Sequence, residues 1–189
     1  MLELHYILET KDKEGKVIRR KKGKSKSWTQ QFCQLLEAQM GQMEAVNARD
    51  TGNILRTLRP YSSNFVMTAG TGVIDYGIRA GIGITAEAIT DYVLVTPIAH
   101  GTGAGQLSHA AVTFTTIAND ATSAWFTVSR NFTNNSGATI TVNEIGMICY
   151  GLDSGGYTRY LLIARDVITA QGVLNNQTLT VTYKIKVVV

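Results

Sequence analysis

The sequence predicts a mostly-β protein, with an antiparallel β-sandwich or jelly-roll body preceded by an N-terminal β-hairpin and one amphipathic helix. The last third of the chain, from about residue 113, alternates apolar and polar residues in runs rich in Val, Ile, Thr and Tyr. That alternation is typical of half-buried antiparallel strands. Clusters of Asn, Asp, Gly and Ser separate the runs, as short turns require. Hydrophobic residues make up 44% of the chain and charged residues 17%, which fits a folded core better than a disordered chain.

Strands are expected in this region at residues 113–115, 124–132, 139–147, 160–165 and 178–187. The final stretch, residues 181–189, is apolar apart from Lys184 and Lys186. An exposed edge of that composition would aggregate. We therefore expect this strand to pair within the sheet or with a neighbouring subunit.

The N-terminal residues predict a β-hairpin. Apolar and polar residues alternate over residues 2–9, which indicates a strand with one apolar face. Residues 11–15 (KDKEG) favour a turn, and residues 16–19 favour a return strand.

One amphipathic helix is expected after the hairpin. Ser27 followed by Gln30 matches a capping box, in which side chains and backbone amides pair at the start of a helix. Gly41 weakens the helix or marks its end. The apolar side chains that recur at helical spacing are Phe32, Leu35, Leu36, Met40 and Met43. Such a stripe usually packs into a core, and a groove for a partner helix is the alternative.

The middle of the chain has a looser pattern. We expect residues 1–64 to form a hairpin-plus-helix docking arm and residues 65–189 to form the β-sandwich body. Residues 100–106 (HGTGAGQ) are the most glycine-rich stretch. A phosphate-cradling loop needs a helix after it, whereas residues 107–117 alternate like a strand. We therefore expect an exposed, mobile loop here and no nucleotide site.

Positive charge is concentrated in the N-terminal third. Residues 1–60 hold 12 Lys and Arg against 7 Asp and Glu, and the remainder holds 6 against 7. The centre of the densest run consists of Arg19, Arg20, Lys21 and Lys22. A basic run can contact nucleic-acid phosphates, but no aromatic residue between Tyr6 and Trp28 offers base stacking. Docking on an acidic protein surface, or a solvated edge strand protected by lysines, is the preferred interpretation.

No arrangement of residues predicts an enzyme. Ser108 and His109 are adjacent in an expected strand, so their side chains point to opposite faces and cannot pair. The sequence has no G-x-S-x-G elbow, and its carboxylates are scattered. The three His and two Cys residues show no close ligand spacing, so we expect neither a metal site nor a cofactor.

Cys33 and Cys149 are expected to be buried free thiols, in a helix and a strand, rather than a long-range disulfide. No apolar run approaches the roughly 20 residues of a membrane helix. The N-terminal residues lack the basic-then-apolar order of a secretory signal. We therefore expect a protein made in a reducing cytoplasm, with no membrane partner.

Glu144 lies inside an apolar strand. A carboxylate among apolar neighbours needs a partner. Arg165 or Arg130 could serve, within the chain or across a subunit interface, and an exposed position for Glu144 is the alternative.

Residues 131–147 (NFTNNSGATITVNEIGM) resemble a phrase common in structural proteins of tailed bacteriophages, in which an "NNSG" or "NTSG" turn leads into a strand that ends in "EIG". Residues 162–167 (LIARDV) and 177–185 (QTLTVTYKI) are similar to the "LIARD" and "GQTLTVTYTI" endings of such proteins. Asn176 stands where those proteins have glycine. Residues 24–32 (KSKSWTQQF) resemble, less closely, a basic helix start of some phage virion proteins. The resemblance covers about half of the chain.

The resemblance implies a non-enzymatic virion protein that is present in many copies, as a capsid decoration protein or as a neck, tail or fibre-attachment component. The expected partners are copies of the same chain, in a closed oligomer, and another capsid, neck or tail protein. The resemblance carries over no catalytic residues. The residues that we expect to contact a partner are Arg19, Arg20, Lys21, Lys22, Trp28, Phe32, Leu35 and Leu36.

Two other functions remain open at this point. A receptor- or carbohydrate-binding module of a tail fibre would use Trp125, Tyr157 and Tyr160 as stacking platforms. Trp125, however, lies in an apolar strand and is expected in the core. A nucleic-acid-binding protein would use the basic run of residues 11–26.

Overall fold

The computed structural model describes residues 2–25, 28–42, 46–60 and 64–188. The strands and the helix that these residues form are β1 (Leu2–Lys11), β2 (Val17–Lys24), α1 (Gln30–Gly41), β3 (Asn47–Arg49), β4 (Leu55–Thr57), β5 (Gly77–Gly81), β6 (Ser108–His109), β7 (Thr113–Phe114), β8 (Ala118–Asn119), β9 (Ser123–Thr133), β10 (Ile140–Leu152), β11 (Thr158–Val173) and β12 (Thr178–Val188).

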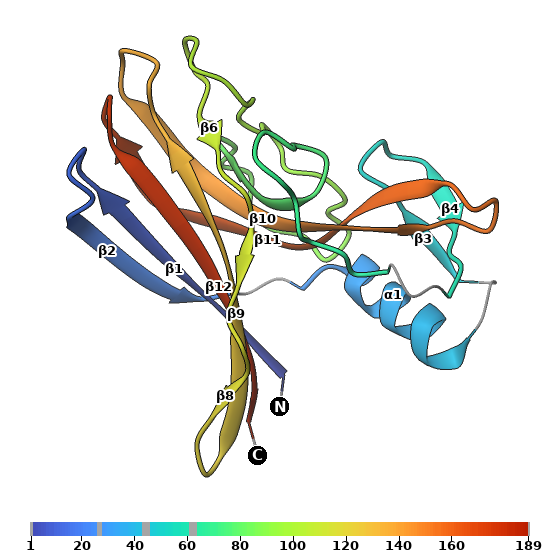
Figure 1. Ribbon diagram of the computed structural model, residues 1–189. Coiled ribbons are helices and arrows are strands. Elements are labelled where there is room, and N and C mark those ends of the chain that lie inside the picture. The colour runs from blue at the N-terminus through green and yellow to red at the C-terminus, as the bar shows by residue number, and fades with distance from the viewer. Residues whose placement is uncertain (1, 26–27, 43–45, 61–63, 189) are drawn as a thin grey trace.

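Two antiparallel sheets enclose the core. The larger sheet has the order β2-β1-β12-β9-β6, and the short strands β7 and β8 also pair with β9. The smaller sheet has the order β11-β10-β5, and β3 and β4 form a separate hairpin beside α1. Strands β10 and β11 are long and curve away from the larger sheet toward α1 and β3–β4 (Figure 1). The prediction of a mostly-β protein with antiparallel sheets and an N-terminal hairpin is confirmed.

The hairpin is continuous with the larger sheet. β1 pairs with β12 from Leu2↔Val187 to Lys11↔Thr178, and it buries Leu4 and Leu8 in the shared core. The return strand extends to Lys24, beyond the predicted segment, and it forms the edge of the sheet. The apolar C-terminal strand is paired within the sheet, as expected, since β1 and β9 flank it. The division of the chain at residue 65 stays a prediction.

Helix α1 differs from the sequence prediction in its N-cap residue and in the residues of its buried face. Its N-cap is Thr29 and makes no side-chain cap hydrogen bond, while Ser27 lies outside the described residues. The hydroxyl of Thr29 donates instead to the carbonyl of Leu162 in β11, which anchors the start of the helix to the smaller sheet. The predicted stripe is also shifted, because Met40 is 81% exposed. Met43 lies outside the described residues. The buried face of the helix consists of Gln31, Leu35 and Ala38.

Residues 82–96, here called the strap, cross the outer face of the smaller sheet without regular structure. The carboxylate of Glu144, on β10, accepts N–H groups of the strap from Gly83 at 3.2 Å, Val95 at 3.1 Å and Thr96 at 2.7 Å. The Glu144 side chain is completely buried. These bonds give three backbone donors of an irregular segment the partners that burial demands.

Arg165, on β11, completes the attachment of the strap. Its Nε donates to Glu144 at 2.9 Å, and its Nη1 donates to Asp91 of the strap at 2.8 Å. Its Nη2 donates to the carbonyl of Thr85 at 2.8 Å. The hypothesis of an intramolecular Glu144–Arg165 pair is therefore confirmed, and an exposed Glu144 is excluded. Gly146 is required beneath the strap, because a Cβ there would lie 2.9 Å from the backbone oxygen of Ala164 as well as 2.8 Å from Leu94 Cδ1.

Arg130, the alternative partner of Glu144, makes a different set of bonds. This residue is 1% exposed, and its guanidinium donates to four backbone carbonyls. We call Arg130 and these carbonyls the carbonyl cradle. The acceptors belong to Gly70, Val73, Ile78 and Ala110.

Candidate functional site

An apolar hollow of about 150 Å³, here called the aromatic groove, lies where the two sheets meet the start of α1. Trp28 and Phe32 stack with ring centroids 4.0 Å apart, and Phe65 meets Phe32 edge-on at 6.1 Å. Phe126 contributes from the larger sheet, and Phe114 of β7 is 45% exposed at the groove. The aromatic groove therefore joins both sheets, the helix and a loop in one apolar surface.

The indole N–H of Trp28 is a further feature of this groove. The Nε1 atom is buried and has no hydrogen-bond acceptor among the described residues. A buried donor without a partner is unfavourable.

The other helix residues that were expected to contact a partner are less accessible. Leu35 is completely buried and belongs to the core, while Leu36 is half-buried. Cys33 is exposed, which corrects the expectation of a buried thiol. Cys149 is a buried free thiol, and its burial raises the pKa to about 12.

The basic run lies on the edge strand β2, where Arg19, Arg20 and Lys22 are exposed and Lys21 is half-buried. Arg20 pairs with Glu9 at 2.7 Å, and Lys21 Nζ donates to the carbonyl of Ala170 at 3.4 Å. The expected edge strand with protecting charges is thus observed. Sequence reasoning did not connect this run with two lysines of β12, although a strand paired with β1 must bring them near.

Lys22, Lys184 and Lys186 line a shallow depression of about 360 Å³ on the outer face of the larger sheet, together with His5. We call this surface the basic face. Lys24, by contrast, is paired with Glu3 at 2.7 Å. The three lysines come from the strands that flank β1 on either side. The fold therefore gathers positive charge from two distant parts of the chain.

Trp125 does not lie in the core, which corrects the sequence expectation. It is half-buried on the outer face, and Lys184 Nζ lies 3.7 Å from its ring centroid. Lys184 therefore occupies a ring face that a sugar would need for stacking. Tyr157 is 65% exposed in the turn between β10 and β11, and Tyr160 of β11 stacks on Tyr76 with ring centroids 6.2 Å apart. The three aromatic residues proposed for carbohydrate binding lie on the larger sheet, in a turn and on the smaller sheet, and they form no single platform.

Ser108 and His109 do not form a catalytic pair. Ser108 Oγ donates to the carbonyl of Gly101 at 3.3 Å. The ring of His109 is buried against Phe132 and His100, and neither ring nitrogen has a described partner. Burial first, and then the neighbouring arginines Arg79 and Arg130, lower the pKa of His109 to about 3.

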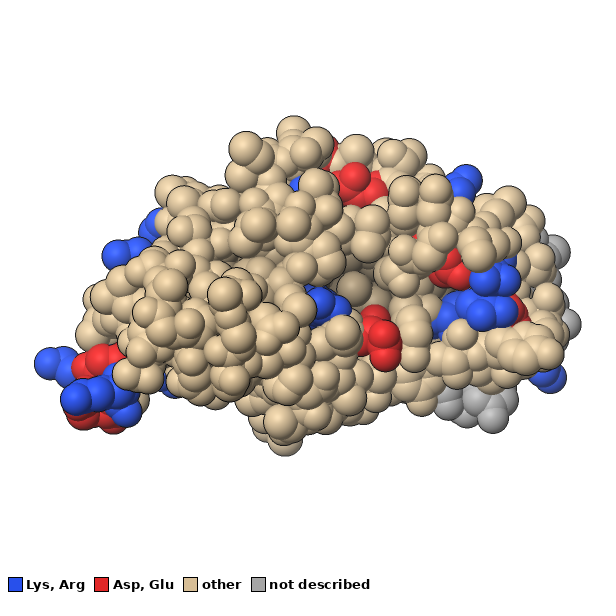
Figure 2. All heavy atoms as spheres, turned by 90° about the horizontal axis from the view of Figure 1, so that it is seen from above, with Lys and Arg blue, Asp and Glu red and all other residues tan. Residues whose placement is uncertain are grey.

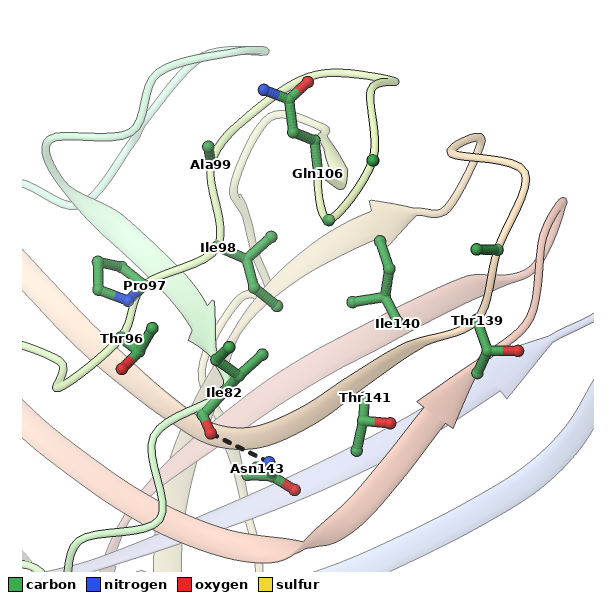
Figure 3. Close-up of a pocket in the computed structure, with 13 residues that line it drawn as sticks. Ile82, Thr96, Pro97, Ile98, Ala99, Gln106, Thr139, Ile140, Thr141 and Asn143 are labelled. Carbon is green, nitrogen blue, oxygen red and sulfur yellow. Dashed lines mark hydrogen bonds between the residues drawn. The ribbon is translucent and has the colours of Figure 1, made fainter.

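A wider hollow of about 670 Å³, here called the edge groove, lies between the segment that contains residues 96–106 and the first half of β10. Ile98 and Ile140 point toward one another across it, and Asn143 Nδ2 donates to the carbonyl of Ile82 at one end at 3.0 Å (Figure 3). None of the described residues that line it carries a charge. The face seen from above is mostly tan, with charged side chains gathered toward its two ends and a few near its middle (Figure 2).

The glycine-rich stretch forms one wall of the edge groove. Its backbone is held by Gly101 N–H bonded to the carbonyl of Leu107 at 3.1 Å and by Gly103 N–H bonded to Gln106 Oε1 at 3.0 Å. A strand, β6, follows it instead of a helix. Sequence reasoning missed the groove because nothing in the order of residues shows that β5 ends before β10 does.

The comparisons with known proteins add no family to this description: no family model, no curated protein and no solved structure matches the chain. The fold and surfaces define a mostly-β protein with two packed antiparallel sheets. In the part of the chain that the structure describes, no helix is long and apolar enough to cross a membrane.

Proposed function

We propose that this chain is a non-enzymatic structural protein of a tailed-bacteriophage particle, which assembles with copies of itself and docks on another protein of the particle. The aromatic groove carries the proposal. It combines partly buried aromatic rings and the exposed Phe114 with an indole donor that lacks a described acceptor, and Trp28 and Phe32 were expected from the sequence to contact a partner. Aromatic-rich apolar surface of this kind is typical of protein–protein contacts.

The positions of the phage-like phrases support the same proposal. Glu144 of the "EIG" phrase and Arg165 of the "LIARD" phrase bond directly to each other. Asn176 adopts a left-handed conformation with φ 66°, which is the conformation that glycine favours, so this chain keeps the turn with another residue. The resembling phrases therefore coincide with residues that hold the β10–β11 and β11–β12 hairpins in place.

The test is the mass of the purified protein in solution, measured by light scattering behind a sizing column at moderate and high salt. We expect a discrete oligomer that survives high salt, because apolar contacts are not screened by ions. The variant Phe114→Glu places a charge at the exposed side of the aromatic groove and is expected to reduce the mass to a smaller species.

Ile84→Glu is the matched control, since Ile84 is 76% exposed on the strap and does not line the aromatic groove. This variant should keep the oligomer intact. A monomer at both salt concentrations would contradict self-assembly, and an oligomer indifferent to Phe114→Glu would remove the groove from the interface.

A second candidate, binding of nucleic acid, is favoured by the basic face. Lys22, Lys184 and Lys186 form no described ion pair with an acidic residue. Anisotropy of labelled duplex DNA should then show an affinity that falls steeply with salt. Replacing these three lysines with serine should abolish it, and an unchanged affinity would rule the basic face out.

A further inference from the structure

The first half of β10 has an open edge. β11 pairs with one side of β10 from Ile140 to Leu152, whereas β5 pairs with the other side only at residues 144–148. No described strand pairs with that second side at residues 140–143. An antiparallel strand directs its N–H and C=O groups alternately to its two sides, so residues 140–143 present backbone donors and acceptors toward the edge groove.

Three other strand edges among the described residues are protected, at least over part of their length. The edge strand β2 carries lysines and arginines, which discourage pairing with another chain. β5 is covered on its far side, where Ile98 N–H bonds to the carbonyl of Ala80 at 2.9 Å. The free side of β11 is covered at Ile163, whose carbonyl accepts the N–H of Thr29 at 3.0 Å. The open part of β10 has neither a charged lining nor a covering segment.

The side chains around this open edge suit an extended chain. Ile140 is buried on the core side of β10, while Thr141 is exposed on the opposite side. Ile98 continues the core-side wall across the groove, and Ile82, which is 47% exposed, lines it as well (Figure 3). A strand placed between them would direct alternate side chains to an apolar wall and to solvent.

We propose that the edge groove binds an extended, uncharged segment of another polypeptide, which adds to β10 as a strand at residues 140–143. Main-chain hydrogen bonds supply the affinity, and the alternation of apolar and small polar side chains supplies the selectivity. The absence of charge among the described lining residues specifies an uncharged partner, because a charged side chain would lose its hydration without gaining a counter-charge. The inference goes beyond the proposed function and holds whether or not the protein belongs to a phage particle.

The test uses the full chain and a short, blocked peptide of about seven residues in which threonine and valine alternate, a length that spans the open edge and its flanks. Binding is measured by fluorescence anisotropy, and the site is located by hydrogen exchange of the backbone amides. We expect the peptide to slow exchange at residues 139–143. N-methylation of alternate amides in the same peptide should weaken binding at least about tenfold, because it removes the donors of the added strand.

The variant Ile82→Lys places a charge in the groove and should weaken peptide binding about tenfold, by the cost of burying an unpaired charge. Ile117→Lys is the matched control, since Ile117 is 74% exposed and does not line the groove. It should bind the peptide like the original protein.

Several results would overturn the proposal: no binding of the peptide, binding that tolerates N-methylation, or protection outside residues 139–143. A dimer of the free protein that Ile82→Lys dissociates would also overturn it, since a second copy would then be the occupant. If Phe114→Glu loses its oligomers but binds the peptide as before, the edge groove accepts a strand independently of self-assembly.

Discussion

The strap and the carbonyl cradle both depend on a buried arginine that bonds to backbone outside its own strand, but the charges of the two arginines are balanced differently. Arg165 is bonded to two carboxylates, Glu144 and Asp91, and to one carbonyl of the strap. Arg130 is bonded to four carbonyls, and no described salt bridge involves it. The strap is therefore fixed by paired charges, and the cradle is fixed by a cation among dipoles.

The pKa values of the two arginines reflect this difference. Burial disfavours the charge of Arg165, but the hydrogen bonds that it donates to Glu144 and Asp91, together with the charges of these carboxylates, outweigh burial and raise the pKa of Arg165. Burial, followed by the nearby Arg79, lowers the pKa of Arg130 to about 10. An arginine can thus hold an irregular segment either through carboxylates or through carbonyls. Only the arrangement with carboxylates leaves an unpaired buried charge when one partner is removed.

Removing Glu144 should give the largest effect. Glu144→Leu leaves three strap N–H groups without acceptors and takes from Arg165 its fully buried partner. We expect the free energy of unfolding to fall by about 3–5 kcal/mol, measured by urea denaturation. The double variant Glu144→Leu with Arg165→Met should lose less than the single variant, because no lone buried charge remains. A double variant as unstable as the sum of both singles would refute this account.

Removing Arg130 should give a smaller effect. Arg130→Met deprives four carbonyls of their donor but leaves no buried countercharge. A loss of about 2–3 kcal/mol in the free energy of unfolding is expected. Hydrogen exchange should quicken around residues 70–73 while the strap stays protected. Faster exchange in the strap as well would show that the two segments are coupled.

Acid should lower the free energy of unfolding through protonation of His109, which lies near Arg130 of the carbonyl cradle. Its pKa is about 3 in the folded protein and 6.5 ordinarily, so the unfolded chain takes up the proton first as pH falls. The full stability is present above about pH 6.5 and declines toward pH 3, by about 1.4 kcal/mol per pH unit, or roughly 2 kcal/mol at pH 5. The charged or titratable groups that face His109 are Arg79, Arg130 and His100.

The measurement is urea denaturation between about pH 7 and pH 5, compared with His109→Phe, which keeps an aromatic ring but cannot titrate. The original protein should lose stability over this range more steeply than the variant. Equal slopes would mean that His109 takes up its proton as readily in the folded chain as in the unfolded chain, which would sink the prediction.

The strands were largely predictable because each one alternates. In β9, Val128 and Phe132 occupy the even-numbered positions, which point inward. Trp125 and Thr127 occupy odd-numbered positions, so the alternation of the strand places them on the outer face. The misplacement of Trp125 was therefore avoidable from the sequence, since an aromatic ring on the polar parity belongs outside. The lysines of β12 share that face and cover the ring.

Other features depend on tertiary register, which a single sequence does not contain. Thr29 became the N-cap because its hydroxyl bonds to Leu162, far away in the chain. Glu144 was correctly expected to need a cation, yet Arg165 and Arg130 were equivalent candidates until the sheets were placed. The edge groove depends on where β5 stops along β10, at Gly81 opposite Glu144, and only the folded arrangement shows that position.

The pairing of β1 with β12 also governs when the protein can fold during synthesis. β12 lies between β1 and β9, so the larger sheet lacks its central strand until the ribosome has made residues 178–188. Until then, β1, which carries Leu4 and Leu8, has no β12 to pair with. Such distant contacts make folding slow and leave apolar surface exposed to aggregation. A prematurely terminated chain would therefore lack the central strand of the larger sheet.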